Sequence, residues 1–375
     1  MRVLLISQDF PPESGGIQTY AYEVSRRLAE RCSLFTAVVP KRNAGEEMSR
    51  EFPGKILRLP VRPDMLPLAA IPVLPFLASE GKFQVALHTQ WQTAVASLIA
   101  RRLTGYPEKI VVAAHGRELK YEPNWVVTWL RPIVTSRVDH FIAVSHFTAG
   151  LLQDYRVPAA DISVVGNGTD PTVFYPADAT PLRRSLGIEN KMVLLTVGRL
   201  TPHKGIDTTL HALGLLKEDF PDLHYLIVGT GPDRERLEGL ARAEDVIEKV
   251  HFVGAVPPDD LRDYYNACDA FIMASRLDGA DVEGFGIAFL EAAACGKPVI
   301  GGRSGGTEDA VLDGETGLLV DPVDVRAVAE SIRTLLEDPD TSERLGKNGR
   351  RHVVDTANWD SVADKIHRIL LDVVG

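Results

Sequence analysis

Residues 192–229, MVLLTVGRLTPHKGIDTTLHALGLLKEDFPDLHYLIVG, contain the pattern that decides the fold. The apolar runs at 192–198 and 223–229 are continuous rather than alternating, which is typical of strands buried on both faces. The segment between them, TTLHALGLLKEDF at 208–220, has the pattern of a helix. A strand, a helix and a second strand in this order predict two parallel strands joined by a right-handed crossover.

The same alternation runs through most of the chain and forms two series. The expected strands of the first series are 3–7, 33–39, 84–88, 109–114 and 140–145, and those of the second are 192–198, 223–229, 249–254, 270–275 and 297–302. We therefore predict an α/β protein with two Rossmann-like, doubly wound parallel sheets, one in each domain.

Turn-forming residues cluster at 164–178, between the two series. We place the domain boundary there, which gives domains at 1–175 and 176–375. The tail is helical in pattern, and a last helix at about 356–375 is able to pack back on the first domain.

The bulk properties are those of a soluble globular protein. The chain has 375 residues, 45% of them hydrophobic, and a formal net charge of −10, which disfavours a broad basic surface for nucleic acid. Its three cysteines, Cys32, Cys268 and Cys295, form no CxxC pair, so we expect reduced thiols in a cytoplasmic protein. No His/Cys spacing indicates a zinc site.

Two apolar segments, 1–7 and 66–78, are too short for a signal peptide and a membrane-spanning helix, respectively. The opening MRVLLIS is too short for a signal peptide, and the longest apolar run, 66–78, contains three prolines. A membrane-spanning helix needs about 20 apolar residues, so we expect no span.

Ligands of open parallel sheets bind at the carboxyl ends of the strands, so the loops that follow strands carry the information about the site. Gly15 and Gly16 precede a helix after the first strand, where free N–H groups suit a phosphate, although the glycine pair alone favours a plain strand-to-helix turn. His115 follows the strand at 109–114 and is either a structural donor or a functional group.

The second series places two cations at the end of its first strand. In VGRLTPHKG, Arg199 and Lys204 stand between Gly198 and Gly205, where a helix opens. Two cations beside a helix N-terminus can hold a diphosphate, which favours function over two solvated side chains. Gly229 indicates close backbone packing, because the third glycine of the dinucleotide fingerprint is missing from VGTGP.

The segment EGFGIAFLE, 283–291, combines a loop and a helix. We expect Glu283 to lie just outside the helix, together with the N–H groups of Phe285, Gly286 and Ile287. Glu291 should lie deeper, about 6–8 Å along the helix axis. One acid with three donors suits a hydroxyl-rich group, and the second acid suits another polyol.

These residues resemble those of the retaining glycosyltransferases of the GT-B fold, family 4, over nearly the whole chain. The signature E-x7-E is matched by Glu283 and Glu291. The glycine-rich N-terminal loop, the His after a strand, the GRL…KG loop and NG-x-D at 167–170 also agree. GGIQTY, DVEGFGIAFLEAAACGKPVI and SGG resemble bacterial mannosyltransferases that build phosphatidylinositol mannosides. The chain departs from the family at Asp309, where glutamate is usual, and at Thr169, where an apolar residue is usual.

The resemblance implies that the domain at 1–175 binds the acceptor and the domain at 176–375 binds the nucleotide sugar, and it implies a role for each position. Gly16, Arg199 and Lys204 would hold the donor diphosphate, and Glu291 would bind the ribose. Glu283 and the backbone of 285–287 would bind the donor sugar. His115 would contact that sugar near the reacting carbon, and the base would lie near Ala255 and Val256.

Catalysis is thus expected of His115, Glu283, Arg199 and Lys204. Donor binding is expected of Gly15, Gly16, Gly198, Arg199, Lys204, Gly229, Ala255, Val256, Glu283, Phe285, Gly286, Ile287 and Glu291. Family chemistry is often drawn as front-side attack, and no cofactor or obligatory metal is implied.

The expected reaction is transfer of a hexose from a nucleotide sugar to a glycan or lipid-linked acceptor, with retention. GDP-mannose is slightly preferred to a UDP-sugar, and an epimerase, a phosphorylase or a non-catalytic nucleotide-sugar-binding protein are rivals. The run 66–78 and the segments WQTAVASLIARRLTG and YEPNWVVTWLRP could meet a lipid surface, because Trp91, Trp125 and Trp129 accompany Arg101, Arg102 and Arg131. Ordinary core helices with solvated arginines are the alternative, and the pattern favours them over lipid contact. We expect a cytoplasmic protein, with peripheral contact to the inner face of a membrane as an option.

Overall fold

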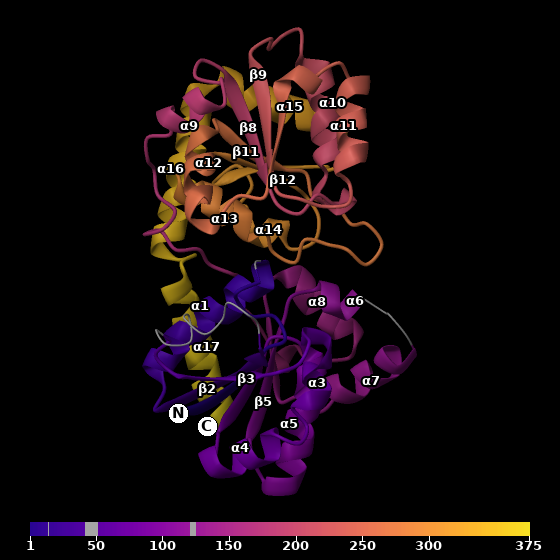
Figure 1. The fold of residues 1–375 in the computed structure, drawn as a ribbon, viewed down its shortest axis with the longest axis vertical. Helices are drawn as coiled ribbons and strands as arrows, with labels where there is room; N and C mark the ends of the chain where they lie inside the picture. Colours follow the sequence, from indigo (N-terminus) through magenta and orange to yellow (C-terminus); the bar gives the residue numbers. More distant parts are fainter. Residues whose placement is uncertain (14, 42–51, 121–124) are drawn as a thin grey trace. The chain divides into compact units, whose positions relative to one another are not determined.

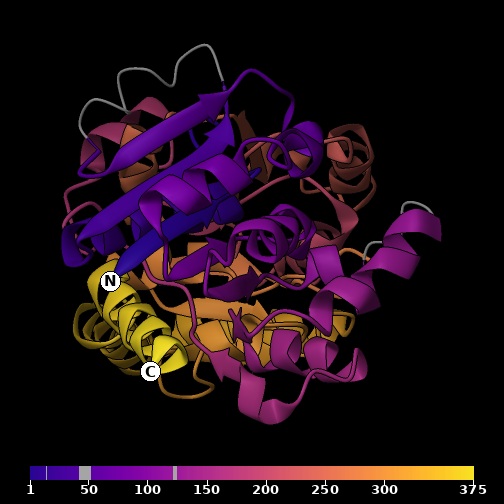
Figure 2. The ribbon, with the colours of Figure 1, turned by 90° about the horizontal axis from the view of Figure 1, so that it is seen from below.

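The computed structural model describes residues 1–13, 15–41, 52–120 and 125–375. These residues form two compact units, one of Met1–Asn167 with Trp359–Gly375 and one of Gly168–Asn358. Figure 1 shows both, with the two chain termini close together in the first unit, as they are again in Figure 2.

The first unit is built on a parallel sheet of seven strands in the order β3-β2-β1-β4-β5-β6-β7. The continuous apolar runs bury the central strands, as in KIVVAA of β5, where only Lys109 is partly exposed. The strands are β1 (Arg2–Ile6), β2 (Leu34–Pro40), β3 (Lys55–Leu59), β4 (Val85–His88), β5 (Lys109–Ala114), β6 (His140–Ala143) and β7 (Ile162–Val164).

Helices cover both faces of this sheet. On one side, α17 packs along α1, and on the other, α3, α4 and α5 enclose a core with β1, β2 and β4 (Figure 1). The α-helices are α1 (Gly16–Arg31), α3 (Leu66–Ala69), α4 (Leu74–Gly81), α5 (Trp91–Thr104), α6 (Arg117–Lys120), α7 (Trp125–Thr135), α8 (His146–Asp154) and α17 (Trp359–Val374), with 3₁₀ turns η1 (Pro63–Met65) and η2 (Ala159–Asp161).

The second unit has a parallel sheet of six strands in the order β10-β9-β8-β11-β12-β13. Its core lies between β8, β9, β11 and helices α10 and α15, where Leu194, Leu210, Ile272 and Ile332 are fully buried. The strands are β8 (Met192–Val197), β9 (Leu223–Val228), β10 (Val250–Gly254), β11 (Ala270–Met273), β12 (Val299–Gly302) and β13 (Gly317–Val320).

The helices of this unit alternate with its strands. They are α9 (Thr180–Ser185), α10 (Ile206–Leu216), α11 (Arg234–Ala243), α12 (Leu261–Ala267), α13 (Ile287–Ala294), α14 (Thr307–Ala310), α15 (Val325–Glu337) and α16 (Pro339–Asp355), with 3₁₀ turns η3 (Pro202–Lys204), η4 (Ile247–Lys249) and η5 (Pro258–Asp260).

The predicted pair of doubly wound sheets is confirmed, and all ten expected strands are present. The sequence pattern missed β3, β7 and β13, which lie at sheet edges and have at most five residues. Edge strands pair on one side only, so their apolar runs are short and partly exposed. The chain also passes between the units at 167/168 and 358/359 rather than at 175 alone. Residues just after 167 stay with the second unit, where the Thr169 N–H donates to the Ala357 carbonyl oxygen at 3.1 Å.

The side chains considered for lipid contact divide between core and surface. Trp91 and Arg131 are buried, and the Arg131 guanidinium stacks on the Trp91 ring at 5.8 Å, so for these two the lipid interpretation is wrong. Trp125 and Trp129 are exposed on α7. Residues 121–124 of that segment lie outside the described residues. Among the residues described, no helix is long and apolar enough to span a bilayer.

Candidate active site

An ion pair joins the loop after β8 to the loop after β11 in the second unit. The Lys204 ammonium donates to Oε2 of Glu283 at 2.5 Å, although 79 positions separate them in sequence. Lys204 follows β8 and Glu283 follows β11, so both stand at the carboxyl edge of the sheet. The side chains are 16% and 15% exposed, which leaves the pair accessible to a ligand but largely desolvated.

Lys204 occupies this place because of the glycine after it. Gly205 has φ +68°, and a Cβ there would lie 1.8 Å from the Ala274 carbonyl oxygen. Only glycine permits both the left-handed backbone and this approach. The turn ends η3 and starts α10, which sends the lysine side chain back along Gly198, whose added Cβ would meet Lys204 Cε at 3.5 Å.

The other side chains of this loop differ in exposure. Arg199 is exposed, and its guanidinium has no hydrogen-bond or ion-pair partner among the described residues. His203 is buried, and burial, together with the charge of Lys204, lowers its pKa. The loop therefore presents two cations, one paired and one free to meet an anion.

Two glycines, Gly198 and Gly229, lie at the ends of β8 and β9 in the loops beside these cations. Gly229 has φ +134°, and a Cβ there would lie 1.9 Å from the Gly198 carbonyl oxygen, so the ends of β8 and β9 approach closely. The Gly229 N–H donates to the Gly254 carbonyl oxygen at 2.8 Å. Ala255 and Val256 follow at the end of β10, with Ala255 exposed. The expected tight backbone packing at Gly229 is thus present.

The start of α13 carries unsatisfied donors next to Glu283. Gly286 is its N-cap residue, with φ +97° and no side-chain cap. Over the described residues, the N–H groups of Phe285, Gly286 and Ile287 have no protein acceptor. The Glu283 backbone is itself fixed, because its carbonyl oxygen accepts from the Gly306 N–H at 2.8 Å. This loop can therefore offer three donors and one carboxylate to a polar ligand.

Glu291 has its own partner, away from the ion pair. Tyr265 of α12 donates its hydroxyl to Glu291 Oε2 at 2.5 Å. Burial raises the pKa of the Glu291 carboxyl, and the Tyr265 hydrogen bond opposes that shift. One carboxylate oxygen is thus held in place, and the other remains for a ligand hydroxyl.

The first unit contributes the N-terminus of α1. Gly15 and Gly16 are exposed at its start, which has no side-chain cap and no acidic residue in the first turn. Gln18 donates to Asp9 Oδ1 at 2.9 Å, and Gln90 donates to Asp9 Oδ2 at 2.5 Å, which ties this turn to the ends of β1 and β4. The helix start is open to an anion.

His115 lies directly after β5 and is 7% exposed. Burial lowers the pKa of its imidazole to about 4, so the ring is neutral at physiological pH. Its Nε2 atom is buried and has no hydrogen-bond partner among the described residues. The Tyr20 ring packs against it edge-on at 4.8 Å.

The structure brings together Lys204, Glu283, Gly198 and Gly229 in one unit and places His115 in the other. Sequence reasoning missed the partners that hold the acids and loops, which are Tyr265, Asp9, Gln18 and Gln90. No local pattern marks these residues, because their contacts join different elements, as Gln90 reaches Asp9 across 81 positions.

Comparison with known proteins identifies the family of the chain. Residues 14–173 match the model of Glycosyltransferase Family 4, and residues 178–352 match that of Glycosyl transferases group 1. The chain is 33% identical to the GDP-mannose-dependent alpha-(1-6)-phosphatidylinositol monomannoside mannosyltransferase of Mycolicibacterium smegmatis, over 98% of both chains. It is 30% identical to the D-inositol 3-phosphate glycosyltransferase of Acidothermus cellulolyticus, over 96% of this chain and 86% of that one.

Solved structures share the fold at lower identity. Anabaena Alr3699/HepE in complex with UDP has a TM-score of 0.84 at 20% identity, covering 99% of this chain and 100% of that chain. The sucrose-phosphate synthase of Thermosynechococcus elongatus has a TM-score of 0.80 at 23% identity, covering 100% and 99%. The chain therefore belongs to glycosyltransferase family 4: it has the GT-B fold and is a retaining hexosyltransferase.

Proposed function

We propose that this enzyme transfers mannose from GDP-mannose to a hydroxyl of a lipid-linked or glycan acceptor and forms an α-linkage. The observation that carries the proposal is the Lys204–Glu283 ion pair beside the unpartnered N–H groups at the start of α13. A nucleoside diphosphate sugar supplies the complements of both groups, a phosphate for the ammonium and hydroxyls for the carboxylate and the N–H groups. The names of relatives such as the M. smegmatis enzyme favour mannose and guanosine.

In this proposal the cations act on the leaving group. Lys204 and Arg199 hold the diphosphate, with the N–H groups at Gly15 and Gly16 as further donors. Donors placed where charge develops stabilise the transition state, and the loss of one typically costs about 3–4 kcal/mol. Gly229 lets the ends of β8 and β9 approach closely beside these cations, since a Cβ there would lie 1.9 Å from the Gly198 carbonyl oxygen.

The remaining groups orient the donor. Glu283 and the N–H groups of 285–287 bind the sugar hydroxyls, Glu291 binds the ribose, and the backbone at 255–256 faces the base. His115, neutral because of its lowered pKa, contacts the sugar near its anomeric carbon. In a front-side reaction, the bond from the anomeric carbon to the phosphate oxygen breaks as the acceptor oxygen bonds on the same face. The acceptor proton passes to the departing phosphate oxygen.

The acceptor side favours a lipid surface. Trp125 and Trp129, one helical turn apart on α7, are 78% and 63% exposed. Tryptophan suits the bilayer interface, and relatives are named for phosphatidylinositol monomannoside substrates. We propose that this aromatic face of α7 contacts the membrane that carries the acceptor.

Thermal denaturation with a panel of nucleotides tests the donor. A ligand that binds only the folded protein raises the melting temperature by mass action. We expect GDP and GDP-mannose to stabilise the enzyme more than UDP, ADP or their sugars at equal concentration. A UDP-selective shift would move the donor to a UDP-sugar, and no shift with any nucleotide would contradict the site.

A further inference from the structure

Unpartnered polar atoms gather around His115 in the first unit. The described structure gives no hydrogen-bond partner to His115 Nε2, the Tyr20 hydroxyl or Glu118 Oε2, and all three atoms are buried. The other carboxylate oxygen of Glu118, Oε1, contacts the backbone of His115, where it accepts from the His115 N–H at 2.7 Å. Buried polar groups without partners are rare, and here no hydrogen bond at His115 Nε2 orients the ring, so the packing of its neighbours must hold it.

Glu118 restrains the backbone of the histidine. It belongs to α6, three residues after His115, and its carboxylate closes the loop onto the His115 N–H. Gly116, between them, has φ +100°, which lets the chain turn tightly enough for this contact.

The ring of His115 is restrained from another direction, by a stack of aromatic side chains. Tyr20 of α1 meets it at 4.8 Å with an interplanar angle of 82°, an edge-to-face arrangement. Trp359 in turn meets Tyr20 at 6.2 Å and 71°. The three side chains are buried, so each can move only if its neighbour moves.

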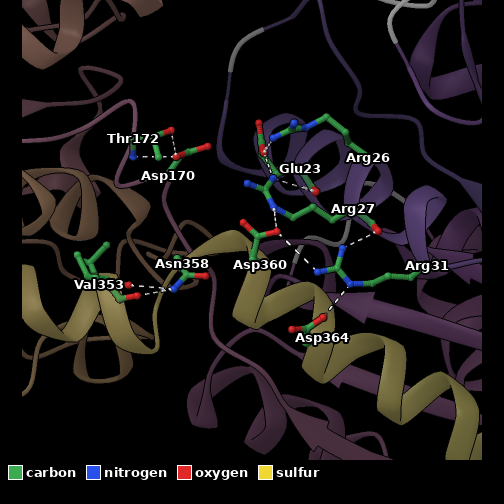
Figure 3. A network of polar contacts seen from close by, with 11 residues as sticks. Glu23, Arg26, Arg27, Arg31, Asp170, Thr172, Val353, Asn358, Asp360 and Asp364 are labelled. Carbon is green, nitrogen blue, oxygen red and sulfur yellow. Dashed lines mark hydrogen bonds and ion pairs between the residues drawn. The ribbon is translucent and has the colours of Figure 1, made fainter.

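Trp359 is the first residue of α17, and ion pairs fix that helix to α1 (Figure 3). Arg27, whose side chain is 6% exposed, bonds to Glu23 on its own helix and to Asp360 Oδ1 at 3.0 Å. One turn further, Arg31 bonds to Asp364 at 2.7 Å. These contacts lie beside Trp359 in sequence and hold the start of α17 against the helix that carries Tyr20.

We propose that Tyr20 is a positioning residue for His115 and that the C-terminal helix, through Trp359, holds Tyr20 in place. The last segment of the chain thereby forms part of the surroundings of His115 in the first unit. Its catalytic consequence rests on the role proposed for His115, whereas the positioning itself is a property of the fold.

Ring resonances of ¹³C,¹⁵N-labelled histidine test the positioning directly, with the His115 signal assigned by its loss in His115→Gln. Tyr20→Leu and Trp359→Leu should both shift the His115 ring resonances. Trp359→Leu leaves the Tyr20 ring in the chain, so a shift of the His115 ring resonances in that variant reports a movement of the rings, whereas Tyr20→Leu also removes the ring current of Tyr20. Both variants should lower kcat for GDP-mannose turnover about tenfold with little change in KM, the signature of lost orientation. Tyr20→Phe keeps the ring edge and should retain the wild-type resonances and kcat. Should Tyr20→Leu fail to fold, Tyr20→Met replaces it, since methionine fills the volume without an aromatic face.

Leu28→Ala is the matched control. Leu28 is fully buried on α1, about 12 Å along the helix from Tyr20, so its loss destabilises the same helix without touching the histidine. Unchanged His115 resonances in Tyr20→Leu, or an equal shift in Leu28→Ala, would overturn the proposal. A shift in Tyr20→Leu but not in Trp359→Leu would overturn the part assigned to α17. Shifted resonances with unchanged kcat would support positioning and contradict the catalytic role of His115.

Discussion

Replacing Lys204 by alanine should weaken GDP binding about 100-fold. A hydrogen bond to a charged group contributes about 1.5–3 kcal/mol, and each 1.4 kcal/mol changes Kd tenfold. The upper end applies here, because the change also leaves the Glu283 carboxylate, 15% exposed and 2.5 Å from the lost ammonium, without its partner. A nucleoside diphosphate would then meet an uncompensated negative charge as well as lose a cation.

The effect of the uncompensated Glu283 charge on GDP binding can be measured separately with a double variant. Lys204→Ala combined with Glu283→Gln removes the repulsion along with the pair, so it should bind GDP more tightly than Lys204→Ala alone. Isothermal titration calorimetry with GDP gives Kd for wild type, both single variants and the double variant. Lys191→Ala is the control, because Lys191 forms an ion pair of the same length, 2.5 Å to Asp222, before β8 instead of after it. GDP affinity of Lys204→Ala equal to that of Lys191→Ala would refute the diphosphate assignment.

Further expectations concern turnover, backbone and pH. Glu283→Gln should lower kcat by about 10²–10³ with unchanged circular dichroism, because it removes a charge that orients the sugar; a normal kcat would exclude this role. Gly205→Ala should lower the melting temperature far more than Gly187→Ala, since both have φ +68° but only at Gly205 would the Cβ meet a backbone atom, at 1.8 Å; equal losses would argue against the close approach. The raised pKa of the Glu291 carboxyl means that its ionisation opposes folding, so its contribution to stability is present at low pH and lost as pH rises through the folded-state pKa. Melting temperatures of wild type and Glu291→Gln should therefore diverge in favour of the variant as pH rises above about 4, and a constant difference across pH would contradict the shift.

The strands and loops were predictable because their signals are local. Each central strand is a continuous apolar run, and the two charged loops of the second unit contain glycines that their backbone geometry requires, Gly205 and Gly286. The placement of Glu283 outside α13 followed from the same pattern. The apolar pattern did not predict edge strands such as β3, because all five residues of β3 are at least partly exposed.

The partners of the predicted residues could not be predicted in this way. Tyr265 reaches Glu291 from another helix, and nothing in its own segment distinguishes it from a core tyrosine. The expected lipid contact divided for the same reason, since Trp91 and Trp129 both lie on helices of the first unit but one is buried and the other is exposed. Burial depends on what packs against a helix, which the helix's own sequence does not contain.

By itself, the sequence determined the two doubly wound sheets, the loops at their carboxyl ends and the family signature of Glu283 and Glu291, since these follow from local apolar runs, glycines and spacing. Only the tertiary structure decided which charges meet. Lys204 and Glu283 pair across 79 positions, and Arg27 of α1 pairs with Asp360 at the start of α17. Such pairings depend on sheet order and helix packing, where small differences between many burial and entropy contributions settle the arrangement, and no short stretch of residues carries that information.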